Sequence, residues 1–502
     1  MYKNQYYITN LKLADPYGLK IISFSNLNVY FHPSLNISIA KKDSTEILLL
    51  GYIINPFKSL ETNNNIIKYL AETCSSKESL FKILQSLSGR YVLLYKNKDD
   101  FIALNDVCAL KQLYYGFVDK HIVLTSSPRM FVDFYGGDLQ ISEQIKEVID
   151  LEEYLDNECT LFGDKCIDNR LLMVLSNHFL NIKNKKVNRM PIYFDEFPNE
   201  RAALEHAATV LQGSISAMTS RHQVLQMLTA GWESRSLLAA SKQVRDRIKY
   251  FVFDLSNGNP RHPDVWVPRK LSEKLGLNFK IEIPEELNEE FLTLFRREHI
   301  LPKIWSRVAE LQYFYNHYSD QNFIRISGVG GGMVKSFYGY ASNDKVHTDM
   351  LYHFSGYAGK SEFVKREIES WIVDARKYAD EYKLPLLDLF HWEQKTPHWG
   401  ALYAFEQDIA IDEFCPFYNK NLLLSILKIN PKKRVNPKPD FFYNLIKYLW
   451  EDTLSEPINP SSSIRNLRWI IKNNAVLDYY KFKVKRSINS LLEISGVRLK
   501  IE

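Results

Sequence analysis

Short apolar runs separated by polar turns characterise the first part of the chain. Residues 47–54 form a continuous apolar run, which predicts a strand buried on both faces. Residues 90–95 and 101–104 lie on either side of a polar turn, the pattern of a β-hairpin. The segment 77–87 instead carries apolar residues at helical spacing. The pattern therefore indicates a mostly β region with a few helices.

The pattern changes after residue 194. Residues 199–218 place apolar side chains on one helical face, and 224–228 is a short apolar strand followed by a loop and a second helix. A further apolar run at 248–253 completes a strand–loop–helix–strand unit, which is typical of a parallel sheet. Beyond residue 280 the pattern is helical, apart from a strand at 323–326. We expect two domains, 1–194 and 195–502.

Composition and charge narrow the functional classes. The 502 residues are 45% apolar and 25% charged, with a formal net charge of +5, so neither disorder nor nucleic-acid binding is indicated. The five cysteines are scattered, which argues against a disulfide framework. The first residues lack the apolar core of a signal peptide, and 47–54 is far shorter than the roughly 20 residues of a membrane span. We expect a cytoplasmic protein without a membrane span.

The loop 229–235 follows a predicted strand and precedes a predicted helix. Backbone N–H groups and the helix dipole favour an anion at such a place, and Gly231 lets the backbone approach a phosphate. The Thr229 and Ser234 hydroxyls and the Arg235 guanidinium are candidate phosphate donors. Glu233 is a candidate magnesium ligand. The alternative is an ordinary strand–turn–helix connection with a serine N-cap.

The segment 327–332 is a second glycine-rich loop after a strand. Glycines occupy four of the five positions 328–332, although glycine loses more backbone freedom on folding than any other residue. Ligands of open parallel sheets bind beyond the carboxyl ends of the strands, so two such loops can face one crevice. A tight turn or close chain packing is the alternative explanation.

Three segments in the second part of the chain resemble a known family. The loop 229–235 reads Thr-Ala-Gly-Trp-Glu-Ser-Arg and resembles the pyrophosphate loop SGGxDS of asparagine-synthetase-like enzymes, and more closely the TGGxDSR form of outlying members. Residues 325–330 resemble the later LSGxGxDE segment, and 414–419 resemble the segment that usually reads RxPFLD. The three occur in the order that the family has.

The first part of the chain resembles the class II glutamine amidotransferase domain that precedes the synthetase domain in this family. The similarity lies in 88–91 and 105–115, and 160–163 falls where the family has its linking segment. The resemblance implies an N-terminal Ntn-hydrolase-like αββα sandwich and a C-terminal α/β domain with a parallel sheet, of the adenine nucleotide α-hydrolase type. It also implies ATP and Mg²⁺ as ligands.

The resemblance assigns roles to individual residues. Glu233 is the implied metal ligand and, with Lys335, a candidate catalytic residue. The implied nucleotide-binding residues are Thr229, Ala230, Gly231, Trp232, Ser234, Arg235, Phe253, Ser327, Gly328 and Gly330. Family members also use a late lysine, for which Lys432, Lys433, Lys438 and Lys447 are candidates.

The chain departs from the family at both sites. Glutamine-hydrolysing members need a cysteine directly after the initiator Met, where this chain has Tyr2, so we expect no glutaminase activity. Glu233 stands in place of an aspartate, and Val329, Gly332 and Met333 stand where the second loop of the family carries acidic residues. Lys335 follows the second glycine loop closely in the sequence and is a candidate to offset phosphate charge in place of the metal. The alternative is that it is an ordinary surface lysine.

Two functions follow from these matches and departures. The first is an ATP-dependent ligase that adenylates a carboxylate and transfers it to an amine without hydrolysing glutamine, as in the β-lactam synthetases and lasso-peptide cyclases that the chain resembles. Its substrate would be a small molecule or peptide from natural-product or surface-polysaccharide modification. The second is a catalytically impaired homologue that binds a nucleotide, a protein partner or a second copy as a scaffold.

The segment 465–486 alternates basic and aromatic residues. We expect a solvated helical face there, with a binding surface as the alternative.

Overall fold

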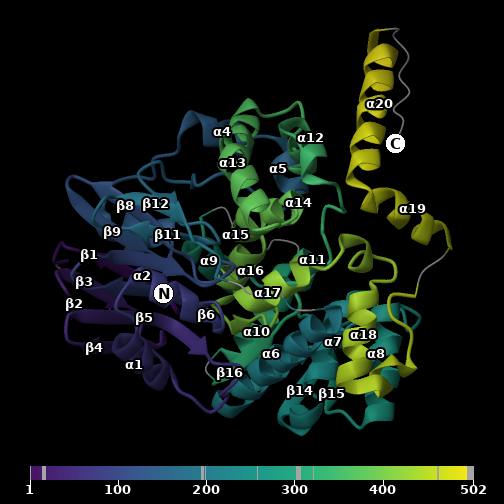
Figure 1. The fold of residues 1–502 in the computed structure, drawn as a ribbon, viewed down its shortest axis with the longest axis horizontal. Coiled ribbons are helices and arrows are strands. Elements are labelled where there is room, and N and C mark those ends of the chain that lie inside the picture. Colours follow the sequence, from purple (N-terminus) through teal and green to yellow (C-terminus); the bar gives the residue numbers. More distant parts are fainter. Residues whose placement is uncertain are drawn as a thin grey trace.

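The structure is a computed structural model that describes residues 2–13, 18–193, 197, 199–256, 258–300, 307–319, 321–460 and 463–494. The expected domain boundary at 194/195 lies outside the described residues. The strands form two antiparallel sheets before this point and one parallel sheet after it (Figure 1).

Each of the first two sheets has six antiparallel strands. The first has the order β10-β8-β9-β1-β3-β2. Its strands are β1 (Tyr6–Thr9), β2 (Lys20–Phe24), β3 (Leu27–Phe31), β8 (Tyr114–Val118), β9 (His121–Thr125) and β10 (Leu172–Met173). The second has the order β12-β11-β7-β6-β5-β4. Its strands are β4 (Ile37–Lys42), β5 (Thr45–Ile54), β6 (Ser88–Lys96), β7 (Phe101–Asn105), β11 (His178–Asn181) and β12 (Lys186–Arg189).

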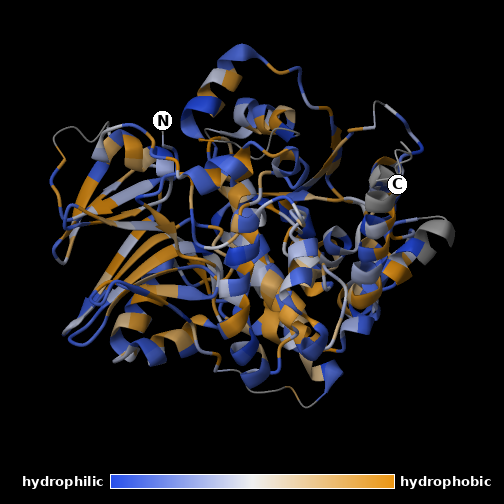
Figure 2. Ribbon diagram, turned by 90° about the horizontal axis from the view of Figure 1, so that it is seen from above, coloured by the Kyte–Doolittle hydropathy of each residue, from blue (hydrophilic) through white to orange (hydrophobic). Residues whose placement is uncertain are grey.

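These sheets pack face to face between two helical layers. In β5, Leu48 and Leu50 pack against the first sheet, whereas Ile47 and Leu49 pack against α1 (Asn63–Thr73) and α2 (Lys77–Leu84). Successive strand residues point to opposite faces, so a strand with both faces covered is apolar throughout. On the outer face of the first sheet, Tyr7 packs with residues of α3 (Pro128–Tyr135). Figure 2 shows the apolar strands of both sheets, and the predicted αββα sandwich is confirmed.

The third sheet is parallel throughout, with the order β15-β14-β13-β16-β17. Its strands are β13 (Gln223–Met227), β14 (Ile248–Phe253), β15 (Phe279–Glu282), β16 (Phe323–Ile326) and β17 (Asp412–Phe414). The predicted parallel-sheet α/β fold is confirmed. Because β13 pairs directly with β16, the loops that follow these two strands emerge side by side.

Helices are the other main elements among the described residues. Those before residue 320 are α4 (Glu143–Ile149), α5 (Glu152–Asp156), α6 (Glu200–Arg221), α7 (Trp232–Ala240), α8 (Pro263–Leu275), α9 (Glu289–Glu298) and α10 (Val308–Tyr318). Those after it are α11 (Gly331–Val334), α12 (Thr348–Phe354), α13 (Glu362–Glu381), α14 (Leu386–Phe390), α15 (Thr396–His398), α16 (Gly400–Gln407), α17 (Lys420–Leu427), α18 (Asp440–Trp450), α19 (Ser463–Asn473) and α20 (Ala475–Ile494). Across the described residues, no helix is both long and apolar enough for a bilayer crossing.

Buried contacts join the sandwich to the helices of the parallel-sheet part. The largest apolar cluster contains residues of both, including Tyr52 and Leu427. Arg90 of β6 is buried and donates to both carboxylate oxygens of Asp408, at 2.6 and 2.8 Å, and to Asp412 of β17 at 2.6 Å. The indole N–H of Trp392 donates to the Val107 carbonyl at 2.8 Å. The two parts therefore share one core.

Candidate functional site

The two glycine loops meet at the side chain of Glu233. An added Cβ at Gly328 would lie 2.8 Å from the Glu233 Cβ, and one at Gly331 would overlap the Glu233 Cγ. Gly328 lies between β16 and α11 and Gly331 is the first residue of α11, whereas Glu233 lies in the first turn of α7 after β13. Only residues without a side chain allow this approach, so the loops that the sequence analysis singled out form one site.

Hydrogen bonds within the loop after β13 hold its shape. The Ser234 hydroxyl accepts from the Thr229 N–H at 3.1 Å and lies 3.0 Å from the Thr229 hydroxyl. The Gly231 N–H donates to the Thr229 hydroxyl at 3.2 Å, and the Ala230 N–H donates to Asp264 of α8 at 2.8 Å. Asp264 was not foreseen from the sequence, because it is 34 residues further along the chain.

The start of α7 differs from a serine-capped helix. Its N-cap is Gly231, which makes no side-chain capping bond, and Ser234 lies inside the first turn. The first N–H groups of a helix have no partner within the helix and carry the positive end of its dipole. The loop therefore presents a helix start suited to a phosphate, as expected from the glycine at 231.

Glu233 and Lys335 form an ion pair across the two loops. Both side chains are partly buried, and the ammonium group of Lys335 lies on one carboxylate oxygen of Glu233. The structure thus brings the two candidate catalytic residues together. The surface-lysine alternative does not describe this position.

The same ion pair bears on the expected magnesium site. Mg²⁺ prefers near-octahedral oxygen coordination, usually with one or two protein carboxylates. Here one oxygen of Glu233 is taken by Lys335, and Val329, Gly332 and Met333 supply no side-chain oxygen. Among the residues that the structure describes, no cluster of three or more His, Cys, Asp or Glu side chains could hold a metal. The donor set does not fit Mg²⁺.

Arg235 has a different role from the expected phosphate contact. Its guanidinium is buried and donates to the carbonyl oxygens of Thr453 and Glu456, at 2.5 and 2.9 Å, and of Pro457 at 3.2 Å. Burial lowers the pKa of this group to about 10. Arg235 therefore fastens the segment 453–457 to α7, and this segment forms a wall of the adjoining cavity.

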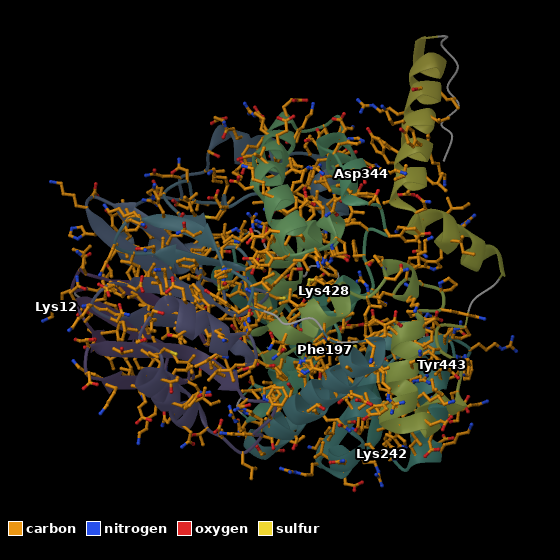
Figure 3. The ribbon with its side chains drawn as sticks, viewed as in Figure 1. Lys12, Phe197, Lys242, Asp344, Lys428 and Tyr443 are labelled. Carbon is orange, nitrogen blue, oxygen red and sulfur yellow. The ribbon has the colours of Figure 1, made fainter. Side chains whose placement is uncertain are left out.

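A cavity of about 1060 Å³ opens beside the first loop. The lining residues include Ala230, Trp232, His262, Asp264, Lys438 and Asn459. Tyr443 of α18, which is labelled in Figure 3, is a further lining residue. The indole N–H of Trp232 is buried and has no hydrogen-bond partner among the described residues. Sites for drug-sized ligands are typically about 300–1,000 Å³, so the cavity has room for a nucleotide.

The structure separates the late lysines. Lys438 lines the cavity with Ala230 and Trp232, whereas Lys433 and Lys447 line a different groove with residues of α6. Lys432 lies over the ring of Tyr340. The sequence offered these four lysines without a choice between them, and only the position of Lys438 is suited to a phosphate in the cavity.

Three other expected nucleotide-binding residues have internal partners. Ser327 donates its hydroxyl proton to Glu413 at 2.6 Å. The Gly330 N–H donates to the Cys415 thiol at 3.3 Å, and an added Cβ at Gly330 would overlap the ring of Tyr418. Phe253 packs edge-on against the rings of Tyr313 and Phe314 in the core. Close chain packing, the alternative named above, accounts for Gly330.

Tyr2 is buried at the contact between the sandwich and α9. Its backbone N–H donates to Glu298 at 2.8 Å, and its hydroxyl donates to Asp133 at 2.5 Å. Burial and the Asp133 hydrogen bond raise the pKa of this phenol far above its usual value. The position at which the family resemblance would place a nucleophile is therefore filled by a packed, neutral phenol.

Comparison with known proteins gives only distant structural likenesses. No protein-family model and no curated protein matches the chain. One similar solved structure is glutamine phosphoribosylpyrophosphate amidotransferase from B. subtilis complexed with ADP and GMP, with 10% identity over 66% of this chain and 71% of that chain, at a TM-score of 0.23.

Two further structures are similar at the same level. An allosteric regulatory enzyme of purine biosynthesis has 11% identity over 72% of this chain and 85% of that chain, at a TM-score of 0.22. Glutamine-dependent NAD⁺ synthetase from Acinetobacter baumannii, in complex with ADP, has 10% identity over 49% of this chain and 55% of that chain, at a TM-score of 0.21. At such TM-scores these likenesses assign neither a family nor an activity to the chain.

Proposed function

We propose that this protein is an ATP-dependent, AMP-forming ligase that joins a carboxylate to an amine without hydrolysing glutamine. In the proposed reaction a carboxylate oxygen attacks the α-phosphorus of ATP, and pyrophosphate leaves. The amine then attacks the acyl carbon, AMP leaves, and the amine loses its proton to a base. Residues 195–502 would carry this chemistry and 1–194 would be a retained amidotransferase-like scaffold, as the asparagine-synthetase-like motifs imply.

The observation that carries the proposal is that the two glycine loops meet at Glu233 and that the first of them borders the cavity. The start of α7 has no side-chain cap, Lys438 lines the cavity with Ala230 and Trp232, and Lys335 pairs with Glu233 of the loop. Stabilising charge at a pre-formed site is the main contribution that a protein makes to phosphoryl and adenylyl transfer. We infer that Lys335 takes the part that a divalent cation has in related enzymes.

The second candidate is a nucleotide-binding scaffold protein. The pairing of Glu233 with Lys335 favours this candidate. Glu233 is the only acidic residue in the sequence of these two loops, and Lys335 occupies one of its carboxylate oxygens. Such a protein would bind ATP at the same loops and release no pyrophosphate. The two candidates thus differ in turnover and agree on the ligand.

The proposed compartment is the cytoplasm. It supplies ATP, and its reducing conditions suit the five scattered cysteines, which are all buried.

ATP binding measured by calorimetry tests the shared part of both candidates. We expect Lys438→Met to weaken ATP binding by at least about tenfold, since a charge-assisted hydrogen bond contributes about 1.5–3 kcal/mol. Lys447→Met is the matched control, because this lysine lies in the separate groove, and it should bind ATP like the wild type. If the wild type does not bind ATP or pyrophosphate, both candidates are wrong.

Pyrophosphate release separates the two candidates. Short peptides and amino acids that carry both a carboxylate and an amine are the substrates to screen, with and without a chelator. We expect release that persists when divalent cations are removed and is lost in Lys335→Met. ATP binding without release for any substrate would favour the scaffold, and release that stops on chelation would contradict the role of Lys335.

A further inference from the structure

The last two helices form an arm that extends away from the body of the protein (Figure 1). Helices α19 and α20, residues 463–494, are called the C-terminal arm here. One face of α20 lies on α12. The ring of Phe482 stacks on that of His353 with 4.1 Å between the ring centroids, and the rings of Tyr479 and His347 have centroids 5.1 Å apart. Asp478 lies 3.6 Å from His353. The arm is therefore held to the body along one side.

The opposite face of α20 is apolar and exposed. Leu477, Tyr480, Val484 and Ile488 are 54%, 59%, 59% and 38% exposed. Successive residues are about 100° apart around a helix, so these four lie on one stripe, across the helix from Tyr479 and Phe482. Ile470 and Ile471 of α19 are exposed as well. The sequence pattern predicts a solvated helical face in this segment. Such a face would be polar, whereas this stripe is apolar and fits the alternative of a binding surface better.

The arm also carries the positive charge of the chain. Residues 463–494 contain seven Lys and Arg against two Asp and Glu, a net charge of +5 that equals the formal charge of all 502 residues. Lys481 and Lys483 are exposed and flank the stripe on its two sides. The rest of the chain is neutral in sum, so the charge is concentrated where the apolar surface is unpartnered.

These properties select one kind of partner. A second copy of the arm would bring another net +5 against the first, which disfavours self-association. A nucleic-acid backbone would match the charge and leave the aliphatic stripe in water. The boundary between headgroups and acyl chains in an anionic bilayer offers phosphate for the lysines and apolar volume for Leu477 and Val484.

We propose that the C-terminal arm binds the surface of membranes that contain anionic lipids, with α20 parallel to the bilayer plane and its stripe inserted at headgroup depth. The helix lies on the membrane and does not cross it. Trp469 of α19 is also a lining residue of the cavity beside the first glycine loop. The arm thus places that cavity close to the membrane surface, independently of which reaction occurs in it.

Sedimentation of the full chain with lipid vesicles tests this proposal. We expect binding to vesicles of phosphatidylcholine with phosphatidylserine, at least tenfold weaker binding to phosphatidylcholine alone, and weakening as salt is raised. The double variant Leu477→Ser/Val484→Ser should lose the apolar contribution to binding, and Lys481→Glu/Lys483→Glu should lose the electrostatic contribution. Each should bind anionic vesicles at least tenfold more weakly than the wild type. All four side chains are exposed, and of their contacts the one lost is that of the Lys483 ammonium with the Tyr479 ring at 5.6 Å, so the melting temperature should change little.

Two matched controls lie on α13. Val373 is 58% exposed, and the side chain of Lys377 is exposed. Val373→Ser and Lys377→Glu should bind vesicles like the wild type. Three results would overturn the proposal: failure of the full chain to bind anionic vesicles, equal binding by the arm variants, and a dimer in light scattering that dissociates in Leu477→Ser/Val484→Ser without any vesicle binding.

Discussion

Two neighbouring glycines of the second loop differ sharply in the space that they leave for a side chain. Gly331 leaves no space for a side chain because Glu233 lies against its Cα. Gly332, the next residue, would place an added Cβ 3.7 Å from Phe337, an ordinary van der Waals contact. The packing of a loop onto its neighbour is thus concentrated at single positions.

This difference gives a pair of matched variants. Gly331→Ala should destabilise the protein by about 1–3 kcal/mol, the usual cost of overpacking, and should separate Lys335 from Glu233. Gly332→Ala should be neutral or slightly stabilising, because alanine favours the helical conformation of α11. Chemical denaturation measures both. Equal effects of the two variants would contradict the close approach of the loops.

His299 makes stability dependent on pH. Its ring is buried against Phe295 and Phe405, neither ring nitrogen has a hydrogen-bond partner among the described residues, and burial lowers its pKa to about 3. The unfolded chain, with a histidine pKa near 6.5, binds a proton that the folded protein excludes between pH 6.5 and 3. Stability should therefore fall as the pH falls through this window.

The contribution of His299 can be isolated by substitution. Between pH 6.5 and 4.5 the difference in proton binding amounts to roughly 2 kcal/mol. We expect His299→Phe to reduce the acid-induced loss of unfolding free energy by about this amount. His317→Phe is the control, because His317 is exposed and pairs with Glu285. If the unfolding free energy of His299→Phe falls with pH as steeply as that of the wild type, burial of this ring does not contribute to the pH dependence.

Tyr2, which precedes the first strand, is held by α9, an element of the other half of the chain. The backbone N–H of Tyr2 and the carboxylate of Glu298 are joined by a hydrogen bond, and the Tyr2 ring is buried. A glutaminase of the class II type needs a free amine beside a nucleophile at this place. The packing of this segment supports the expectation that the first domain is a scaffold.

Ammonia release from glutamine tests this expectation. We predict no release above background for the wild type, and none for Tyr2→Cys, because the N–H group at this position is engaged by Glu298. An active glutaminase of known structure serves as the positive control. Release by the wild type would contradict the scaffold role, and release by Tyr2→Cys would show that only the side chain had been lost.

The halves of the protein are joined by buried charge as well as by apolar contact. Arg90 satisfies Asp408 and Asp412, and Lys111 lies 3.4 Å from Asp408. Removal of one partner from such a network leaves an uncompensated buried charge. The shared core and this network favour unfolding of both halves together.

Thermal unfolding of an Arg90 variant tests this coupling. Arg90→Met should reduce the free energy of unfolding by about 3–5 kcal/mol. Calorimetry should show the unfolding temperatures of both halves falling together. Arg201→Met is the control, since Arg201 forms an exposed pair with Glu205 and should change stability by less than about 1 kcal/mol. Two separate transitions, of which only one moves, would contradict a common core.

The periodicity of the chain determined the kinds of element and much of their order. Residues 47–54 lie within β5, 224–228 overlaps β13, and 323–326 is β16, because strands covered on both faces must be apolar. The glycine pattern also identified the two loops, since glycine allows a close approach that other residues prevent. The mostly β first part and the parallel sheet could be predicted at this level, whereas the αββα arrangement was implied by the family resemblance.

Only the tertiary structure decided what the polar side chains do. The sequence assigned Arg235 and Ser327 to a ligand, yet folding gives them internal partners. The contact of Asp264, the choice of Lys438 among the candidate lysines and the Glu233–Lys335 pair followed only when distant segments met. The exposed stripe of α20 likewise depends on which face α12 covers. A local pattern records burial and turns, whereas the partner of a charge is set by elements far away in the chain, so the chemistry of this protein is a property of its packing.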